Sequence, residues 1–406
     1  MEDETKAVPA DMALQGIRVL DMSRVLAGPW CTQTLADLGA EVWKIEAPVN
    51  GDDTRSWMPP EVDGESTYFM CANRSKQSLA INLKTPEGQA LVRRLAEQAD
   101  VLVENYRLGT LERFGLGYED LAEVNPRLVY CSISGYGRTG PRASEPGYDF
   151  IIQAESGLMA ITGAEEGEPM KLGVAITDLV TGMNGVQAIL AALFSRERTG
   201  RGQHIDLALL DGATCILANI GSGYLAAGHE PQRFGNAHPT VVPYQIMSSC
   251  DGQFALAVGN DRQFSSLCLA MGRPELARDE RYRLNRDRVL NRDTLIPELQ
   301  RTFSAQTTDY WIGCVRAAGV PCGSVRTVPQ AMDAPEIEAR GLIAKVADAR
   351  HGTLRLTASP LKLRGTPPRK PGAPPRLGEH TDNILGGVLN CTPAELEQWR
   401  AAGIIA

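Results

Sequence analysis

An alternation of strand and helix signals in the first 135 residues is the feature that most limits the fold. The segment Gly16–Arg24 (GIRVLDMSR) is predicted as a buried strand, Leu26–Leu38 as a helix and Glu41–Glu46 as the next strand. A strand, a helix and a strand within about thirty residues form a βαβ unit, whose two strands are parallel. The alternation continues with the strand Ser78–Leu83, a helix opened by Thr85 and Pro86, and the strands Val101–Tyr106 and Leu128–Ile133. The pattern predicts an α/β fold with a Rossmann-like parallel sheet.

The turn after the first strand argues against one common use of such a sheet. Dinucleotide-binding folds carry a GxGxxG sequence at this place, whereas this chain has Leu26–Pro29 (LAGP). A nicotinamide or flavin dinucleotide is therefore not indicated, because the fold alone does not specify a function.

The remaining sequence predicts a second, smaller domain. A chain of 406 residues exceeds the ~250–300 residues at which a single core stops growing. A long helix is expected from Asp178 to Arg198, a loop over 228–243, a strand over 251–258 and arginine-rich helices up to 318. We expect a large α/β domain in residues 1–224, a small α+β domain in 225–325, and a linker that returns to the large domain in 326–406.

Composition and charge exclude several classes of protein. The formal net charge of −8 disfavours a nucleic-acid reader, which needs a basic face. The nine cysteines are scattered, without a CxxC pair or a Cys/His cluster, which supports no metal site and fits a reducing compartment. The start (MEDETKAVPADMALQG) lacks the apolar region of a signal peptide, and no apolar run reaches the ~20 residues of a membrane span. We expect a soluble cytoplasmic protein.

One acidic residue stands at a place suited to nucleophilic chemistry. Asp178 lies in the run Gly173–Met183 (GVAITDLVTGM), where a stretch of small residues passes into the long predicted helix. Aspartate is a common N-cap, so a purely structural role is one interpretation. A carboxylate at a helix N-terminus is also kept ionised and oriented by the helix dipole, as attack on a thioester requires. The two interpretations are compatible.

Two loops and several basic residues are weaker candidates. The segment Phe234–Pro239 (FGNAHP) is either an interdomain loop or a lid whose N–H groups approach a reacting carbonyl. The polar turn Gly51–Arg55 (GDDTR) is either a surface turn or part of the crevice at the carboxyl ends of the strands. Four basic residues at strand or loop ends are each more often solvated, but together could hold a polyphosphate; they are Lys76, Arg113, Arg138 and Arg142.

These and other motifs, in this order and spacing, resemble the family III CoA-transferases, which include formyl-CoA and carnitine CoA-transferases and the α-methylacyl-CoA racemases. The resemblance runs from Leu14 to about Ile404. It rests on RVLAGP at 24–29, LGAEVWKIE at 38–46, GDDTR at 51–55, KTPEG at 84–88, VENY at 103–106, GYGRTGP at 135–141, TDLVTG at 177–182, RTGRGQ at 198–203 and LGEHTD at 377–382. Within the family, ESTYF at 65–69, NRSKQS at 73–78, GVAITDL at 173–179 and GNAHPTVVPYQ at 235–245 are most similar to the succinyl-CoA:glutarate branch.

The resemblance implies a fold, a nucleophile and a CoA site. Subunits of this family are open rings of a large and a small domain, and two rings interlock into a homodimer. Asp178 matches the catalytic aspartate, and CoA thioesters are substrates, so no separate cofactor is implied. The positions that match CoA contacts are Val25, Leu26, Ala27, Lys76, Asn105, Arg113 and Tyr136, with Arg138 as a substitute for basic residues replaced by Ala47 and Ser134. Gly235 and His238 fall where some members have a glycine-rich loop over the active site, but the run of glycines is absent here.

Two other functions remain open at this stage. A 2-methylacyl-CoA racemase needs a second base, and the Gly-His-Asp triplet of racemases is Gly147-Tyr148-Asp149 here. Tyrosine is a poor base near neutral pH. A CoA-binding protein without catalysis is disfavoured by an intact Asp178. We expect a transferase that moves CoA from succinyl-CoA to a short dicarboxylate such as glutarate.

A dicarboxylate substrate would bring a second carboxylate into the site. A buried carboxylate without a partner is costly, so a cation or several hydrogen-bond donors must meet it. Arg24 and Arg55 are the arginines best placed by topology, and His238 could add a donor. For Arg24, a structural ion pair with a nearby acid is an equally good interpretation.

Overall fold

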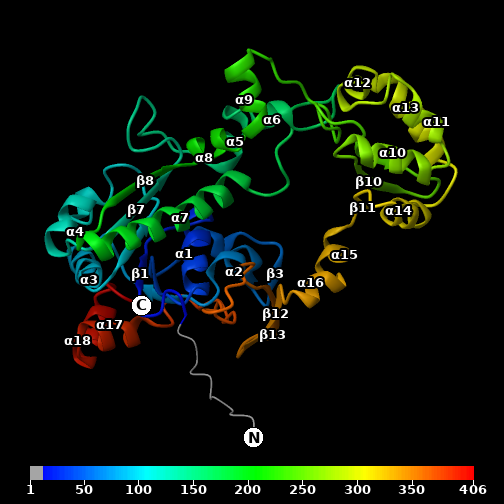
Figure 1. The fold of residues 1–406 in the computed structure, drawn as a ribbon. Coiled ribbons are helices and arrows are strands. Elements are labelled where there is room, and N and C mark those ends of the chain that lie inside the picture. The colour runs from blue at the N-terminus through cyan, green and yellow to red at the C-terminus, as the bar shows by residue number, and fades with distance from the viewer. Residues whose placement is uncertain (1–11) are drawn as a thin grey trace, which may run out of the picture. The chain divides into compact units, whose positions relative to one another are not determined.

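The computed structural model describes residues 12–406, and its first compact unit, residues 12–157, 172–222 and 335–406, is built on a six-stranded sheet (Figure 1). The order across the sheet is β5-β2-β1-β6-β7-β8, and every neighbouring pair is parallel. The strands are β1 (Arg18–Asp21), β2 (Glu41–Glu46), β5 (Gln77–Ala80), β6 (Val101–Glu104), β7 (Val129–Ser134) and β8 (His204–Ala208). The predicted parallel α/β sheet is confirmed, whereas the predictions for residues 1–11 lie outside the described residues.

The order of the strands changes direction between β1 and β6. The chain runs from β1 outward through β2 and β5, and it then returns to the centre and continues outward through β6, β7 and β8. Open α/β sheets bind ligands outside the carboxyl ends of their strands at such a switch point. The segments that follow β1 and β6 therefore frame the expected site.

Helices cover both faces of this sheet. On one face, α1 (Ala27–Asp37) and α7 (Ile176–Thr199) lie side by side (Figure 1). On the other face, one apolar core joins the sheet to α3 (Pro86–Glu97), α4 (Tyr118–Val124), α17 (Thr381–Leu389) and α18 (Pro393–Ala401). The first unit also contains η1 (Asp53–Ser56), α2 (Thr67–Asn73), η2 (Glu112–Phe114), α5 (Asp149–Glu155) and α8 (Leu209–Cys215).

Local sequence signals set the ends of the helices that support the site. Thr85 caps α3 by accepting a hydrogen bond from the Gly88 N–H at 3.1 Å, with Pro86 in the first turn. Gly200 ends α7 in the left-handed conformation, with φ of 71°. Contrary to the sequence expectation, α7 is long and apolar enough to cross a membrane by length and composition alone. It packs along α1, β7 and β8, as core helices of soluble proteins do.

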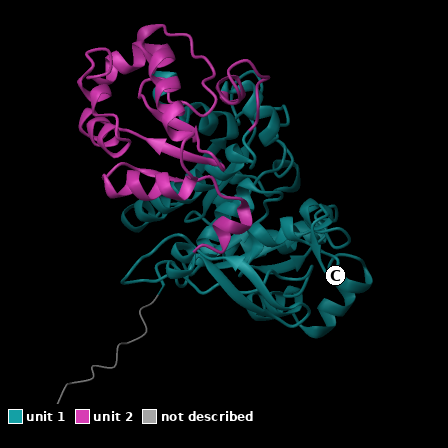
Figure 2. Ribbon diagram, turned by 90° about the vertical axis from the view of Figure 1, so that its right-hand side faces the viewer, with its two compact units in different colours: residues 1–157, 172–222, 335–406 teal, residues 158–171, 223–334 magenta. Residues whose placement is uncertain are grey.

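Residues 158–171 and 223–334 form a second compact unit (Figure 2). Its antiparallel sheet has the order β11-β10-β9, and an apolar core around Phe254 and Phe303 joins the sheet to the helices. The strands are β9 (Tyr244–Ser248), β10 (Gln253–Ala257) and β11 (Cys322–Ser324). The helices are α6 (Leu158–Ile161), α10 (Asp261–Ala270), α11 (Pro274–Arg278), α12 (Asn285–Leu290), α13 (Arg292–Phe303), α14 (Thr308–Ala317) and α15 (Val328–Met332), while α9 (Ala218–Ala227) belongs to both units.

The units differ from the predicted domains at two segments, of which one, residues 326–334, was predicted as the start of the linker and belongs to the second unit. Residues 158–171, expected in the large domain, group with the second unit. The physical reason is Arg233, whose guanidinium donates hydrogen bonds to the carbonyl oxygens of Ala160, Ala164 and Gly167. Sequence patterning does not reveal such a contact between distant segments.

The chain rejoins the first unit at residue 335. This last part begins with α16 (Pro335–Ala339) and the hairpin of β12 (Ile343–Asp348) and β13 (Gly352–Thr357). The turn of this hairpin contacts the shorter hairpin of β3 (Glu61–Val62) and β4 (Glu65–Ser66) through an ion pair of Arg350 with Glu65. Residues 360–375, a proline-rich stretch within the predicted linker, contain neither helix nor strand.

Candidate active site

Asp178 lies inside α7 rather than at its cap. It is the third residue of the helix, and the N-cap position belongs to Ala175, which makes no side-chain hydrogen bond. The Asp178 side chain is half-buried. Burial, followed by the negative charge of Asp149, raises the pKa of the Asp178 carboxyl to about 7. The prediction that Asp178 caps the helix is therefore wrong, and burial together with a like charge places its pKa above the ordinary value of an aspartate.

Asp149 is the carboxylate that binds the start of α7. Its Oδ1 accepts hydrogen bonds from the Thr177 N–H at 2.8 Å and from the Thr177 hydroxyl at 2.7 Å. Its Oδ2 accepts a hydrogen bond from Gln153 at 2.7 Å. Asp149 thus fixes the residue before Asp178 and also supplies the charge that opposes ionisation of Asp178. Sequence reasoning missed this role, although the triplet at 147–149 contained the signal.

Tyr68, in α2, is a second residue that sequence reasoning missed. Burial, and next the charge of Asp178, raises the pKa of the Tyr68 phenol to about 12. The phenol therefore keeps its proton at neutral pH and stays a hydrogen-bond donor. Trp57 packs edge-on against the Tyr68 ring, with 5.1 Å between the ring centroids. The ESTYF motif was the available signal, but it was used only for the resemblance.

The turn after β1 has an unusual backbone. Val25 has φ of 68°, in the left-handed region that β-branched residues rarely adopt. The residue before Val25, Arg24, is held by the side chain of Asn105, which directly follows β6. The Asn105 Oδ1 accepts a hydrogen bond from the Arg24 N–H at 2.9 Å, and its Nδ2 donates one to the Arg24 carbonyl at 2.7 Å. A side chain at Gly28 would collide with Ser23, since a Cβ there would lie 2.2 Å from the Ser23 Cβ. The predicted CoA positions Val25, Leu26, Ala27 and Asn105 are thus neighbours at the switch point.

Lys76 is not available to a ligand, contrary to the prediction. Its side chain is fully buried, and its ammonium donates to Asp21 Oδ2 at 2.9 Å, the Pro29 carbonyl at 3.0 Å and Asn73 Oδ1 at 2.9 Å. An ammonium has three donors, so none is left for a phosphate. Burial lowers the pKa of Lys76 to about 8. Its position beneath the turn instead supports the carbonyl of Pro29.

Two of the predicted arginines are also held within the protein. Arg55 forms a two-point ion pair with Glu46, with both N···O distances at 2.7 Å, and its guanidinium stacks on Phe69. This pairing removes Arg55 as a ligand of a substrate carboxylate. Arg138 lies between Glu112, which it contacts closely, and the buried Glu104, at 3.6 Å. Its charge is therefore balanced without a CoA phosphate.

Arg24, Arg113 and Tyr136 are more accessible. Arg24 pairs with Asp53 at 3.2 Å, and both side chains are about half exposed. The structural interpretation of Arg24, an ion pair with a nearby acid, is thus confirmed. An exposed ion pair of this kind contributes only ~0–1 kcal/mol to the free energy of unfolding. Among the described residues, Arg113 forms no ion pair, and its guanidinium contacts only the Thr110 hydroxyl, at 3.3 Å. The Tyr136 hydroxyl donates to Glu155 at 2.6 Å.

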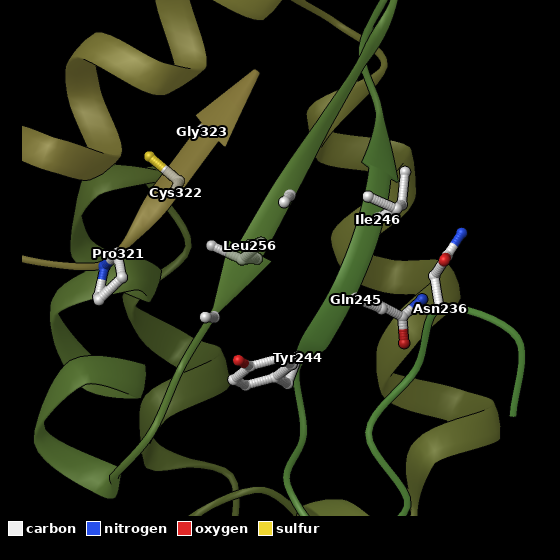
Figure 3. A pocket seen from close by; sticks show the side chains of 10 residues that line it. Asn236, Tyr244, Gln245, Ile246, Leu256, Pro321, Cys322 and Gly323 are labelled. Atoms are coloured by element: carbon white, nitrogen blue, oxygen red, sulfur yellow. The ribbon is translucent and has the colours of Figure 1, made fainter. Parts of the chain in front are cut away.

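Gly235 and His238 lie in a loop of the second unit. Gly235 has φ of 56°, which explains the glycine. The His238 ring accepts a hydrogen bond from the Thr240 N–H at 3.1 Å, and the guanidinium of Arg292 holds the His238 carbonyl at 2.8 Å. The loop borders a cavity of about 360 Å³ beside β9, β10 and β11 (Figure 3). Its lining includes Asn236, Tyr244, Gln245, Ile246, Leu256 and Cys322.

No acidic, histidine or cysteine cluster suited to a metal ion occurs within residues 12–406.

The candidate site combines a half-buried carboxyl with a pKa near neutrality, a protonated phenol and a strained turn at the switch point. A carboxylate of this kind can act as a nucleophile or as a general base.

The chain is similar to known proteins over most of its length. Residues 14–381 match the sequence profile of CoA-transferase family III. The chain is 46% identical to a succinate–glutarate CoA-transferase of Agrobacterium fabrum, over 92% of this chain and 94% of that protein. It is 41% identical to the succinyl-CoA:glutarate CoA-transferase of Homo sapiens, over 97% of this chain and 90% of that protein. The crystal structure of a CAIB/BAIF family protein from Brucella suis matches with a TM-score of 0.83 at 43% identity, over 93% and 99% of the two chains.

Proposed function

Because the chain belongs to CoA-transferase family III and is a CoA-transferase, we propose that it moves CoA from succinyl-CoA to glutarate with Asp178 as the nucleophile. The observation that carries the nucleophile is the half-buried Asp178 carboxyl, whose pKa of about 7 is set by burial and by Asp149. The names of the relatives, at 41% and 46% identity over nearly the whole chain, support the two acids.

The proposed reaction consists of four balanced exchanges at one carboxylate. The Asp178 carboxylate attacks the thioester carbonyl of succinyl-CoA, so that a mixed anhydride forms and the CoA thiolate leaves. The thiolate attacks the aspartyl carbonyl, which gives an aspartyl-CoA thioester and free succinate. Glutarate then attacks this thioester to form a second anhydride, and the thiolate finally attacks the glutaryl carbonyl. Glutaryl-CoA leaves and the carboxylate is regenerated, so neither a metal nor a separate cofactor takes part.

The surroundings of Asp178 suit this cycle. A half-buried carboxylate has lost part of its hydration, which makes the ionised form more reactive. The Tyr68 phenol, protonated because burial and the Asp178 charge raise its pKa, can donate a hydrogen bond to the oxyanion that develops during each attack. Tyr68 therefore acts as an electrostatic partner and does not need to transfer a proton.

The proposed CoA site lies at the switch point of the sheet. Its contacts are Val25, Leu26, Ala27, Asn105, Arg113 and Tyr136. Arg24 remains a candidate for the distal carboxylate of the acid, because its exposed pair with Asp53 can be exchanged for a substrate carboxylate at little cost. His238 and Gly235, on the loop of the second unit, are proposed to contact the acyl group.

We also propose an interlocked, ring-shaped homodimer in the cytoplasm. Large apolar side chains on α7 are exposed in the single chain, including Met183, Leu190 and Phe194, and such a patch is typical of a protein interface. The nine free cysteines fit a reducing compartment. Light scattering after dilution tests the assembly: an interlocked dimer keeps the mass of two chains, whereas a monomer at micromolar concentration would contradict the proposal.

An isotope experiment tests the nucleophile directly. When glutarate labelled with ¹⁸O in its carboxylates is used with succinyl-CoA, the anhydride step leaves one labelled oxygen on Asp178. Mass spectrometry should find a gain of about 2 Da, in the peptide that contains Asp178 and not in the peptide that contains Asp149. Asp178→Ala should fold but lose transfer and labelling. An unlabelled Asp178 during rapid turnover would refute the mechanism.

A second experiment tests the racemase alternative. Deuterium exchange from the solvent into the α-carbon of 2-methylacyl-CoA would indicate a racemase instead of a transferase.

A further inference from the structure

The turn that follows β1 is strained and is held from outside. Val25 has φ of 68°, a region in which a β-branched residue is strained. The two hydrogen bonds between Asn105 and the Arg24 backbone, at 2.9 and 2.7 Å, fix the peptide group on either side of Arg24. The Val25 N–H donates to Asp52 Oδ1 at 3.3 Å. The strain persists because the surroundings satisfy the backbone groups in this one conformation.

A buried ion pair supports the same turn from below. The Lys44 ammonium donates to the Ser23 carbonyl at 2.9 Å and to Asp52 Oδ2 at 2.9 Å, and both charged side chains are fully buried. Lys44 belongs to β2 and Asn105 follows β6. The turn is therefore held from the strands on both sides of β1, by Lys44 and by Asn105, and we call these contacts the clamp.

We propose that Asn105 is a positioning residue that acts through Val25, by holding the strained turn in the conformation that accepts the CoA thioester. This inference rests on the proposed function and adds a task to a residue expected only to contact CoA. The apparent affinity for a ligand falls with the fraction of protein in the competent conformation. When the clamp is released, Val25 returns to negative φ, and the CoA site is lost in most molecules.

The Val25→Gly variant distinguishes whether Asn105 acts by positioning the turn or by direct contact with CoA. Glycine adopts positive φ without penalty, so Val25→Gly removes the strain that Asn105 opposes. Relief of ~1–2 kcal/mol corresponds to about tenfold in an equilibrium, since 1.4 kcal/mol is tenfold. Asn105→Ala should therefore raise the KM for succinyl-CoA about tenfold in the wild-type background. In the Val25→Gly background the same change should cost less than about threefold.

The experiment uses the full-length chain, with the single and double variants of Asn105 and Val25. The KM and kcat for succinyl-CoA and the KM for glutarate are measured, and the turn is followed by hydrogen–deuterium exchange of the peptide over residues 23–27. Asn125→Ala is the matched control, because Asn125 also binds backbone carbonyls of the same unit, those of Ala96 and Ala99 at 3.0 and 2.8 Å. This control reports a general loss of stability.

The expected result is faster exchange of the turn in Asn105→Ala, with a rise of KM for succinyl-CoA that exceeds the change in kcat. The control should leave both quantities near the wild-type values. An equal cost of Asn105→Ala in both backgrounds would overturn the proposal, since it would mean direct contact with CoA. Unchanged exchange of the turn would overturn it as well. If the wild-type chain transferred no CoA, the proposed function would fail, whereas the exchange data would still test the clamp.

Discussion

Replacement of Asp178 is expected to stabilise the protein at alkaline pH while it abolishes transfer. The folded chain holds this carboxyl half-buried near Asp149, so its pKa is about 7 instead of the ordinary 3.8. Asparagine keeps the size of the side chain and removes the charge that must be buried at pH 8. We expect Asp178→Asn to unfold at a higher temperature than the wild type at this pH, because active sites store unfavourable interactions of this kind.

The direction of the pH dependence follows from the two pKa values. The unfolded chain loses the proton near pH 3.8 and the folded chain near pH 7, so the folded protein binds more protons between these values. The free energy of unfolding of the wild type therefore falls as the pH rises through this window. The pKa difference of about three units corresponds to at most ~4 kcal/mol at pH 8. Partial exposure and the cost of burying the asparagine amide reduce the expected gain to about 1–3 kcal/mol.

Thermal unfolding of both proteins between pH 4 and pH 8 at constant ionic strength measures this effect. A gain of about 1–3 kcal/mol corresponds to a rise in Tm of a few degrees at pH 8, and the rise should shrink towards pH 4. Asp293→Asn is the matched control, because Asp293 also lies in the first turn of a helix but is exposed. A Tm equal to the wild type at pH 8, or a rise that does not depend on pH, would refute the reasoning.

Three further predictions concern the groups around the site. Asp149→Asn removes the like charge next to Asp178, so the acid limb of the profile of kcat/KM against pH should move about one unit lower; an unmoved limb would show that burial alone sets the pKa. Tyr68→Phe removes the proposed donor to the oxyanion and should lower kcat about tenfold or more with a smaller change in KM; an unchanged kcat would exclude that role. Lys76→Met leaves the buried Asp21 carboxylate without its ammonium partner, which costs about 3–5 kcal/mol, and calorimetry should show a clear fall in Tm; an unchanged Tm would mean that the pair is dispensable.

The sequence contained enough information to predict the sheet and to single out Asp178 as the candidate nucleophile. Strands such as Val101–Glu104 (VLVE) are short, mainly apolar runs, and their side chains are buried on both faces, so the parallel sheet could be predicted from local pattern. Asp178 could be located because one short motif surrounds it. Its ionisation could not be predicted, because burial and the approach of Asp149 arise from segments that are distant in sequence.

The basic residues show where such reasoning fails. Arg55 and Lys76 are polar residues near strand ends, as ligand-binding cations are, but each meets a buried carboxylate: Arg55 pairs with Glu46 of β2, and Lys76, next to β5, pairs with Asp21 of β1. Lys76 and its partner Asp21 are 55 positions apart. A single sequence does not show which carboxylate a cation meets, so it cannot separate a ligand-binding arginine or lysine from one that balances an internal charge.

The packing of Ile404 and Ile405 against the core of the first unit has a consequence for synthesis on the ribosome. Ile405 bridges to Ile81 beside the sheet, and the Asn82 N–H donates to the Ile404 carbonyl at 2.8 Å. Both isoleucines belong to the apolar core that packs against α3 and the sheet. The nascent chain can thus complete residues 223–334 while the core of the first unit still lacks one wall. Until residue 405 leaves the exit tunnel, that apolar surface is open to chaperones and proteases, so translational stalling before codon 404 should yield an aggregation-prone product.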